Sequence, residues 1–347
     1  MTLYLRADER FFMSNAFGID LGTNNIKIYS HATDEIMVQK NLIAIQDKKT
    51  IFAYGDSAYE MYEKAPANFD ISFPVNNGVI SDLNNMETLI RFFISDLQDG
   101  KIQPADFLVA VPSDITDVEK RAFYDLIKEA NVKGKRILVA DKAVADGLGM
   151  GLDVKSTQGI MVIDVGYETT EVSVISLGGI VLNRLLKVGG LAFDETIKGM
   201  VRRDFNLHIG NKTAEYIKCS LTELESEGRG ALVFGRDVVS GLPVEREIPT
   251  KLVDQALQAN FDSIIETIRL CLELTPPELA ADIYRNGIYM TGGASQVNHL
   301  IESISNGTNL RVNITDSPMT SVAEGLGRIL KEPGYQSIAY SVEGMSK

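Results

Sequence analysis

Two segments of the chain share one pattern of apolar and polar positions. In each, an apolar run ends in Asp-x-Gly and is followed by a second run in which apolar and polar residues alternate. The first copy covers residues 16–29 and the second covers residues 159–176. Alternation with a period of two is typical of a strand with one buried face. Each copy is therefore predicted to be a β-hairpin, with Asp20 or Asp164 at its tip.

The rest of the chain predicts both strands and helices. An unbroken apolar run at 107–112 is typical of a buried strand. Apolar positions within 116–130 recur at helical spacing, with Ser113 or Thr116 available as the N-cap. The same reasoning predicts a long amphipathic helix and a further buried strand later in the chain, at residues 250–274 and 287–293.

The repeated hairpin predicts a duplicated fold. Asp20 and Asp164 lie 144 positions apart, and no Gly/Ser linker, low-complexity run or short-period repeat separates them. With 347 residues, the chain also exceeds the size at which one hydrophobic core usually stops growing. We therefore expect two similar α/β halves, connected by crossing segments, that face each other across a cleft.

Composition and charge narrow the possible partners. Hydrophobic residues make up 45% of the chain and charged residues 23%, which is an ordinary globular balance. The formal net charge of -13 disfavours binding to nucleic acid and to anionic lipid, because both carry negative charge. Two cysteines, Cys219 and Cys271, are too few for a disulfide framework and fit a reducing cytoplasm.

The N-terminal segment allows two interpretations. No run approaches the roughly 20 apolar residues that span a bilayer, and the pattern of a secretory signal is missing from the sequence. Residues 1–13 carry apolar positions on both sides of a charged patch from Arg6 to Arg10. They form either a short amphipathic membrane foot or, in the simpler interpretation, an unstructured leader or the product of a start codon placed upstream of a true start at Met13.

Three turns carry the candidate chemistry. A turn built from Gly22 and Thr23 lets backbone amides approach phosphate oxygens closely. Asp20 and Asp164 can hold a hydrated Mg²⁺ between them, because that ion keeps several waters and takes few protein carboxylates. The third turn, at 291–295, lies between a strand and a helix and can accept a nucleoside against bare backbone. Each turn by itself also fits an ordinary β-turn or a close packing point.

In combination, these turns resemble those of the MreB group of bacterial actins, within the superfamily that includes actin, sugar kinases and heat-shock chaperones. The resemblance covers residues 17–330. It includes four stretches that are peculiar to MreB-like proteins, at residues 111–121, 174–181, 235–243 and 274–279. It implies an α/β, actin-like ATPase fold with two duplicated halves, and so four subdomains around a nucleotide cleft.

The resemblance also implies boundaries and roles. The expected subdomains are IA (14–44, 84–153 and 325–347), IB (45–83), IIA (154–190 and 255–324) and IIB (191–254), after a leader at 1–13. The implied cofactors are ATP and Mg²⁺. The first implied phosphate loop is Gly22, Thr23 and Asn24, and the second is Gly166, Tyr167, Glu168 and Thr169. The implied adenosine loop is Gly292, Gly293 and Ala294, and the helix near adenine and ribose carries Glu215 and Lys218. Asp20 and Asp164 are implied to bind the metal through water, and Asp141 is implied to be the catalytic carboxylate.

This sequence departs from the family pattern at three positions of the site. Asp141-Lys142 stands where relatives carry two glutamates, and a shorter carboxylate at 141 predicts slow hydrolysis. Glu168 stands where a glycine is usual. Its charge about 4 Å from a phosphate would cost roughly 1 to 4 kcal/mol, depending on the local dielectric. Lys142 either offsets that charge, by pairing with Glu168 or at the triphosphate, or points to solvent.

The resemblance implies ATP-dependent filaments that direct cell shape and wall synthesis from the inner membrane face. The implied partners are the chain itself, a conventional MreB and inner-membrane cell-shape proteins. Residues 97–104, where many relatives carry an apolar membrane loop, are mostly polar, so any peripheral membrane contact depends on the N-terminal segment or on a partner. Two alternatives remain: a paralogue that copolymerises without cycling nucleotide, and a small-molecule kinase.

Overall fold

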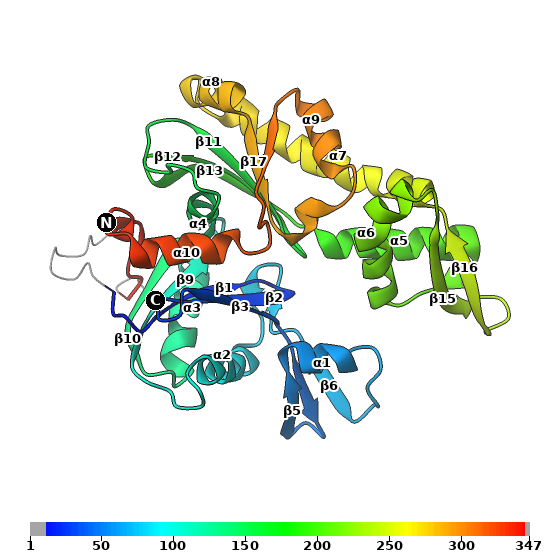
Figure 1. Cartoon of the computed structure of the whole chain (residues 1–347), viewed down its shortest axis with the longest axis horizontal. Coiled ribbons are helices and arrows are strands. Elements are labelled where there is room, and N and C mark those ends of the chain that lie inside the picture. The colour runs from blue at the N-terminus through cyan, green and yellow to red at the C-terminus, as the bar shows by residue number, and fades with distance from the viewer. Residues whose placement is uncertain (1–11, 344–347) are drawn as a thin grey trace.

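Two five-stranded sheets of identical topology form the centre of the molecule (Figure 1). In each sheet three consecutive strands form an antiparallel meander, and two later strands add in parallel beside its first strand. The computed structural model describes residues 12–343. The first sheet has the order β10 (Gly134–Asp141), β9 (Ala105–Val111), β1 (Ala16–Leu21), β2 (Asn25–Ser30) and β3 (Glu35–Lys40). The second has the order β18 (Val312–Ile314), β17 (Ile288–Thr291), β11 (Ile160–Val165), β12 (Thr170–Ser176) and β13 (Gly179–Leu186).

The matching topology confirms the predicted duplication. β1 and β11 are the predicted apolar runs, and all six residues of each strand are buried. In the two hairpins Asp20 lies opposite Lys27 and Asp164 lies opposite Glu171. The two aspartates therefore occupy the same place in the two halves, at the carboxyl ends of the central strands.

Helices cover both faces of the first sheet. On one face α2 (Leu83–Leu97) and α3 (Asp117–Glu129) pack over a core that includes Phe17 and Phe107. Thr116 caps α3 in a reciprocal capping box with Glu119, so Thr116 is the N-cap and Ser113 is not. On the other face lie α4 (Lys142–Gly149) and α10 (Ser321–Lys331).

The second sheet carries the larger hydrophobic core. The predicted long helix is α7 (Thr250–Leu274), and it shares this core with α5 (Gly190–Phe205) and α6 (Asn211–Ser226). Further along the chain, α8 (Pro277–Asn286), the 3₁₀ turn η2 (Gly293–Gln296) and α9 (Leu300–Thr308) follow. The segment that follows β17 is a 3₁₀ turn, whereas the sequence predicted that a helix begins there.

Two smaller sheets extend the halves on one side of the molecule (Figure 1). Beside the first half lie the β5-β4-β6 sheet, the hairpin β7–β8 and α1; beside the second half lies the β14-β15-β16 sheet. The four parts agree with the expected fold class, and the residue boundaries of the subdomains remain predictions. The bounds are β4 (Ile43–Gln46), β5 (Thr50–Tyr54), α1 (Gly55–Met61), β6 (Phe69–Ser72), β7 (Val75–Asn76), β8 (Val79–Ile80), β14 (Leu207–His208), β15 (Ala231–Asp237) and β16 (Pro243–Ile248), with the 3₁₀ turn η3 (Gln336–Ile338) near the C-terminus.

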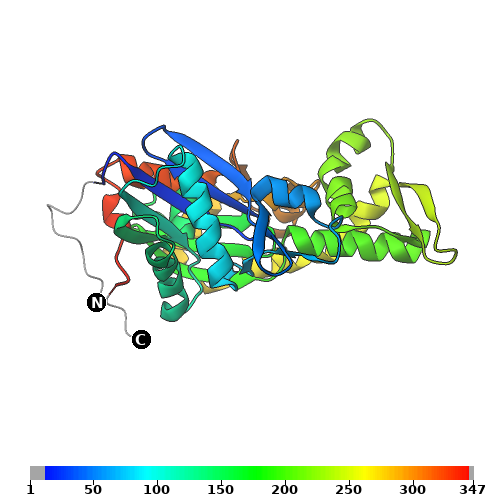
Figure 2. The same cartoon turned by 90° about the horizontal axis from the view of Figure 1, so that it is seen from below.

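The described part of the chain begins and ends on the same side of the molecule, away from the small sheets (Figures 1 and 2). Met13 donates its backbone N–H to Asp106 at 2.9 Å, and the guanidinium of Arg136 stacks on the ring of Phe12. The remainder of the predicted leader, residues 1–11, lies outside the described residues. Among the described helices none is long and apolar enough to cross a membrane.

The chain passes between the halves at α4 and α10, which touch backbone to backbone. A Cβ added to Gly325 would lie 1.8 Å from the carbonyl oxygen of Ala145, and one added to Gly149 would lie 1.9 Å from that of Ser321. Real Cβ atoms do not approach so closely, so both positions accept only glycine. This crossing fixes the start of α4 relative to both sheets, because α4 also contacts β10 and β11.

We therefore expect Gly325→Ala to lower the free energy of unfolding by about 3 kcal/mol or more, because two backbones must separate. Chemical denaturation followed by circular dichroism measures this change. Gly199→Ala in α5 is the matched control, because a Cβ there meets no atom within 4 Å. That variant should gain about 0.5–1 kcal/mol from helix propensity. Equal effects of the two substitutions would contradict a backbone contact at Gly325.

Candidate functional site

A cavity of about 540 Å³ lies between the two halves. This volume falls in the range of small-molecule sites. The tips of both hairpins, the turn after β17, the start of α4 and one side of α6 all contribute to its lining. The predicted site residues found in the lining are Asp20, Gly22, Thr23, Asn24, Asp164, Gly166, Tyr167, Glu168, Thr169, Glu215, Lys218, Gly292, Gly293 and Ala294.

The first turn has a fixed shape. A Cβ on Gly22 would lie 2.6 Å from the carbonyl oxygen of Asn25, so a larger residue does not fit. Asn41, which follows β3, makes two hydrogen bonds to this turn. Its side-chain amide donates to the carbonyl oxygen of Gly22 at 2.9 Å, and its backbone N–H donates to the carbonyl oxygen of Asn24 at 2.9 Å. Sequence reasoning missed Asn41, because its role depends on a contact between distant positions.

The second turn is tied to the start of α5. The N–H of Gly166 donates to the carbonyl of Thr169 at 2.8 Å and closes the turn. The carbonyls of Gly166 and Tyr167 accept hydrogen bonds from the N–H groups of Gly190 and Leu191 at 3.0 and 2.6 Å. These hydrogen bonds hold the second turn against the start of α5.

The third turn depends on Gly292, which has φ of +91°. A Cβ at this position would lie 2.2 Å from Oδ1 of Asp164 and 2.3 Å from the carbonyl of Val165. The turn therefore lies directly against the tip of the second hairpin. Gly293 has open space on its Cβ side, so its backbone is accessible from the cavity.

Two ion pairs form the floor of the cavity. Lys27 Nζ lies 2.9 Å from Oδ2 of Asp20, and Lys142 Nζ lies 2.5 Å from Oδ2 of Asp164. Burial disfavours the ionised form of Asp20, but Lys27 and Lys142 outweigh it and hold its pKa below the usual value. Burial likewise opposes the charge of Lys142, but Asp164 and Asp20 outweigh it and raise its pKa. Both carboxylates therefore already have a cationic partner.

A buried hydrogen-bond chain lies beside these pairs. Asp146 accepts a hydrogen bond from Ser321 Oγ at 2.7 Å, and Ser321 Oγ is 2.6 Å from Thr291 Oγ1. Burial and then the nearby Asp164 raise the pKa of Asp146 well above its usual value. Its other oxygen has no hydrogen-bond partner among the described residues. Sequence reasoning missed Asp146, although it lies one helical turn after Lys142 and so on the same face of α4.

Glu168 contacts the opposite half of the molecule. Its carboxylate accepts a hydrogen bond from the backbone N–H of Asn77, in the turn between β7 and β8. Among the described residues, Lys142 forms its ion pair with Asp164. The predicted direct pairing of Lys142 with Glu168 is therefore wrong, and so is the alternative that Lys142 points to solvent, because it lines the cavity.

The two predicted residues of α6 have protein partners. Glu215 accepts a hydrogen bond from the hydroxyl of Tyr59 at 2.6 Å, across the mouth of the cavity. Lys218 is buried, pairs with Asp194 at 2.8 Å and donates to the carbonyl of Gly190 at 3.1 Å. Lys218 thus joins α6 to α5, and Glu215 joins α6 to α1.

Asp141 is the one predicted site residue that the structure places elsewhere. It does not line the cavity. Its carboxylate accepts a hydrogen bond from the hydroxyl of Tyr340 at 3.1 Å and lies 3.8 Å from Lys120 Nζ. Asp141 is the N-cap residue of α4, and the side chain that enters the cavity is that of the next residue, Lys142. The catalytic role predicted for Asp141 has no support in this geometry.

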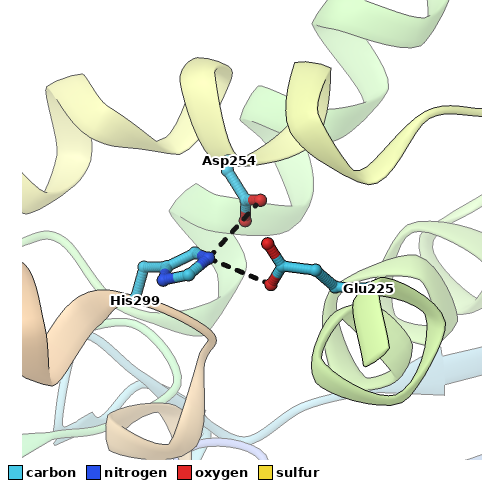
Figure 3. A group of neighbouring side chains, drawn as sticks. All are labelled: Glu225, Asp254 and His299. Atoms are coloured by element: carbon cyan, nitrogen blue, oxygen red, sulfur yellow. Dashed lines mark hydrogen bonds and ion pairs between the residues drawn. The ribbon is translucent and has the colours of Figure 1, made fainter. Parts of the chain in front are cut away.

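A second group of polar side chains lies outside the cavity lining (Figure 3). Glu225 from α6, Asp254 from α7 and His299 at the N-cap of α9 point toward one another. His299 Nε2 lies 3.1 Å from Glu225 and 3.8 Å from Asp254. Burial opposes the charge of His299, but the two carboxylates outweigh it and raise the pKa of His299. Ion pairing between three helices accounts for this group.

The two halves and the cavity between them define an actin-like protein, and solved structures agree. MreB 5 of Spiroplasma citri bound to AMPPNP superimposes with a TM-score of 0.85 at 30% identity, over 93% of this chain and 97% of that one. The filament protein MamK, from a double helical filament, superimposes with a TM-score of 0.74 at 21% identity, over 92% of this chain and 99% of that one. The second likeness supports the fold alone.

Sequence comparisons give the family. The MreB/Mbl protein family model matches residues 14–337. The chain is 34% identical to cell shape-determining protein Mbl of Bacillus subtilis (strain 168), over 90% of this chain and 95% of that protein. It is also 34% identical to cell shape-determining protein MreB of Escherichia coli (strain K12), over 93% of this chain and 95% of that protein. The chain belongs to the MreB/Mbl family and is a bacterial actin-like cytoskeletal protein.

The contacts of Asp141 predict a structural role. Asp141→Ala leaves the Tyr340 hydroxyl without its partner, so the free energy of unfolding should fall by about 1–2 kcal/mol. Asp141→Asn keeps a hydrogen-bond acceptor and should lose less. Denaturant titration measures stability, and titration with a fluorescent ATP analogue measures the site. A weakened affinity for the analogue in either variant would show that Asp141 acts in the cavity after all.

Proposed function

We propose that this protein binds ATP in the cavity and assembles into filaments that direct cell shape. The observation that carries the proposal is that three tight turns meet at one cavity. Two of these turns contain a glycine, Gly22 or Gly292, at which protein atoms leave no room for a Cβ atom. Such turns expose backbone N–H groups to a phosphate or a nucleoside. MreB 5 of Spiroplasma citri, which shares this fold, has been solved with AMPPNP and with ADP.

The roles of the turns in this proposal follow their position in the cavity. The turns after β1 and β11 hold the phosphates, with Thr23 and Thr169 adding hydroxyl donors. The turn at Gly292, Gly293 and Ala294 lies against the adenosine. Glu215 lines the adenosine side of the cavity from α6, while Lys218 supports that wall through Asp194.

A Mg²⁺ ion bound through water to Asp20 and Asp164, which the resemblance implied, does not fit the residues present. Both carboxylates have ammonium partners, at 2.9 Å for Asp20 and 2.5 Å for Asp164. Mg²⁺ demands octahedral coordination and retains most of its waters, so it needs unoccupied carboxylate oxygens and space around them. The proposal therefore includes ATP and leaves this ion out.

We further propose that any hydrolysis is slow. The side chain that enters the cavity at the start of α4 is the ammonium of Lys142, which donates hydrogen bonds and cannot accept one. It therefore cannot orient an attacking water as a general base does. This feature would suit a paralogue that copolymerises with a conventional MreB, whereas a kinase is disfavoured because the family model spans residues 14–337.

The proposed filament contact includes the outer side of the β15–β16 hairpin. Apolar side chains are exposed there at Leu232, Phe234, Val239 and Leu242. Clusters of exposed apolar residues mark interaction sites in soluble proteins. A second copy of the chain is the proposed occupant, in keeping with the cytoskeletal family.

We also propose that the protein lies at the inner membrane face and contacts cell-shape proteins there. Membrane attachment through residues 1–13 stays a prediction.

Sedimentation of purified protein with ATP, with ADP and without nucleotide tests the proposal. We expect polymer that depends on nucleotide, with filaments in electron micrographs, either for the protein alone or with a conventional MreB. Phe234→Asp should abolish polymer and leave nucleotide affinity unchanged. Leu177→Asp is the matched control, because Leu177 is 70% exposed and Phe234 is 71% exposed. Absence of polymer under every condition would exclude the filament function.

Glu168 generates a separate prediction. Its charge lies in the second phosphate turn and should repel bound phosphate. Glu168→Gln keeps an acceptor for the N–H of Asn77 and removes the charge, so ATP affinity should rise between about fivefold and a thousandfold. Glu63→Gln is the control, because Glu63 accepts a hydrogen bond from the N–H of Asn211 at 3.0 Å and does not line the cavity. An unchanged affinity in both variants would mean that the Glu168 charge does not reach the phosphates.

A further inference from the structure

We infer that the ammonium of Lys142 replaces the divalent cation of the site, so that this chain binds nucleoside phosphates without Mg²⁺. The inference rests on the proposed function, because it requires a nucleotide in the cavity. It states that the positive charge facing the phosphates comes from a side chain of the protein, Lys142, and not from a bound metal ion.

The position of Lys142 carries the inference. Its Nζ lies 2.5 Å from Oδ2 of Asp164, which is direct contact and leaves no room for a water between them. A hydrated Mg²⁺ held by Asp164 would need that space for its own water shell. Asp20, the other carboxylate, is in contact with Lys27 at 2.9 Å. One oxygen of each carboxylate, Oδ2, is therefore already in contact with an ammonium group.

Lys142 also has donors to spare. An ammonium carries three N–H donors, and its one ion pair within residues 12–343 is with Asp164. The Lys142 side chain lines the cavity together with the turns after β1 and β11. A phosphate held by those two turns would lie within reach of the remaining donors. A charge-assisted hydrogen bond from an ammonium to phosphate is stronger than one between neutral groups.

The helix geometry prevents Lys142 from moving away as a whole. It is the first residue of α4, and α4 is held by the backbone contacts of Gly149 with Ser321 and of Ala145 with Gly325. Only rotation of the side chain could free Asp164, and rotation would leave a buried carboxylate unpaired, which is costly. Binding of Mg²⁺ at this place would therefore have to displace an existing ion pair.

The affinity of the full-length protein for a fluorescent ATP analogue, measured in Mg²⁺ and in EDTA, tests the inference. We expect the two dissociation constants of the native protein to agree within about threefold. Lys142→Met removes the charge and keeps the length of the side chain. Its affinity in EDTA should fall by about tenfold or more, and Mg²⁺ should restore much of that loss, since Asp164 is then free.

The control is Lys120→Met, because Lys120 pairs with Asp141 outside the cavity. It should bind the analogue as the native protein does, with and without Mg²⁺. Asp164→Asn is a second test that keeps the ammonium: binding in EDTA should persist, whereas loss of binding there would overturn the inference. Thermal unfolding without nucleotide verifies that each variant is folded before its affinity is compared.

The outcomes separate this inference from the proposed function. If the native protein binds in Mg²⁺ and loses about tenfold or more of its affinity in EDTA, the inference is wrong and the nucleotide function stands. The inference is also wrong if Lys142→Met binds as tightly as the native protein in EDTA. If the native protein binds the analogue under neither condition, both the nucleotide function and the inference fail.

Discussion

The backbone contact between α4 and α10 is the constraint on which the site depends. Gly149 and Gly325 let the two helices approach more closely than side chains would allow. As a result the chain can pass from one half to the other twice within a small volume, and the first turn of α4 comes to lie beneath both hairpin tips. Lys142 and Asp146 therefore reach the cavity floor from a helix that belongs to the junction and not to either sheet.

Charge balance then decides what the cavity can bind. Lys27 and Lys142 neutralise Asp20 and Asp164 within the floor, and burial raises the pKa of Asp146 and so favours its neutral form. In the proposed site, these two ammonium groups take the place of a metal ion in compensating the carboxylates. The same arrangement leaves Glu168 in the cavity lining without an ammonium partner among the described residues, although the N–H of Asn77 partly stabilises its charge.

Local features of the sequence were enough to predict the hairpins, the three turns and the duplication, because each depends on residues close together in the chain. The orientation of α4 was not predictable in this way. Adjacent residues at a helix start point in different directions, and the partner of Asp141, Tyr340, is nearly 200 positions away in the sequence. Asn41 and Asp146 were missed for the same reason: distant contacts define their roles. The family resemblance named loops that line the cavity, together with one carboxylate, Asp141, that does not line it.

The two halves share a topology, yet contacts across the cavity mouth tie them together asymmetrically. Helix α6 carries this asymmetry. Glu215 on α6 reaches across to Tyr59 of α1, while the far side of the same helix packs against β15, the strand that exposes Phe234. Helix α6 therefore contributes to the cavity lining through Glu215 and also contacts the strand of the proposed filament contact.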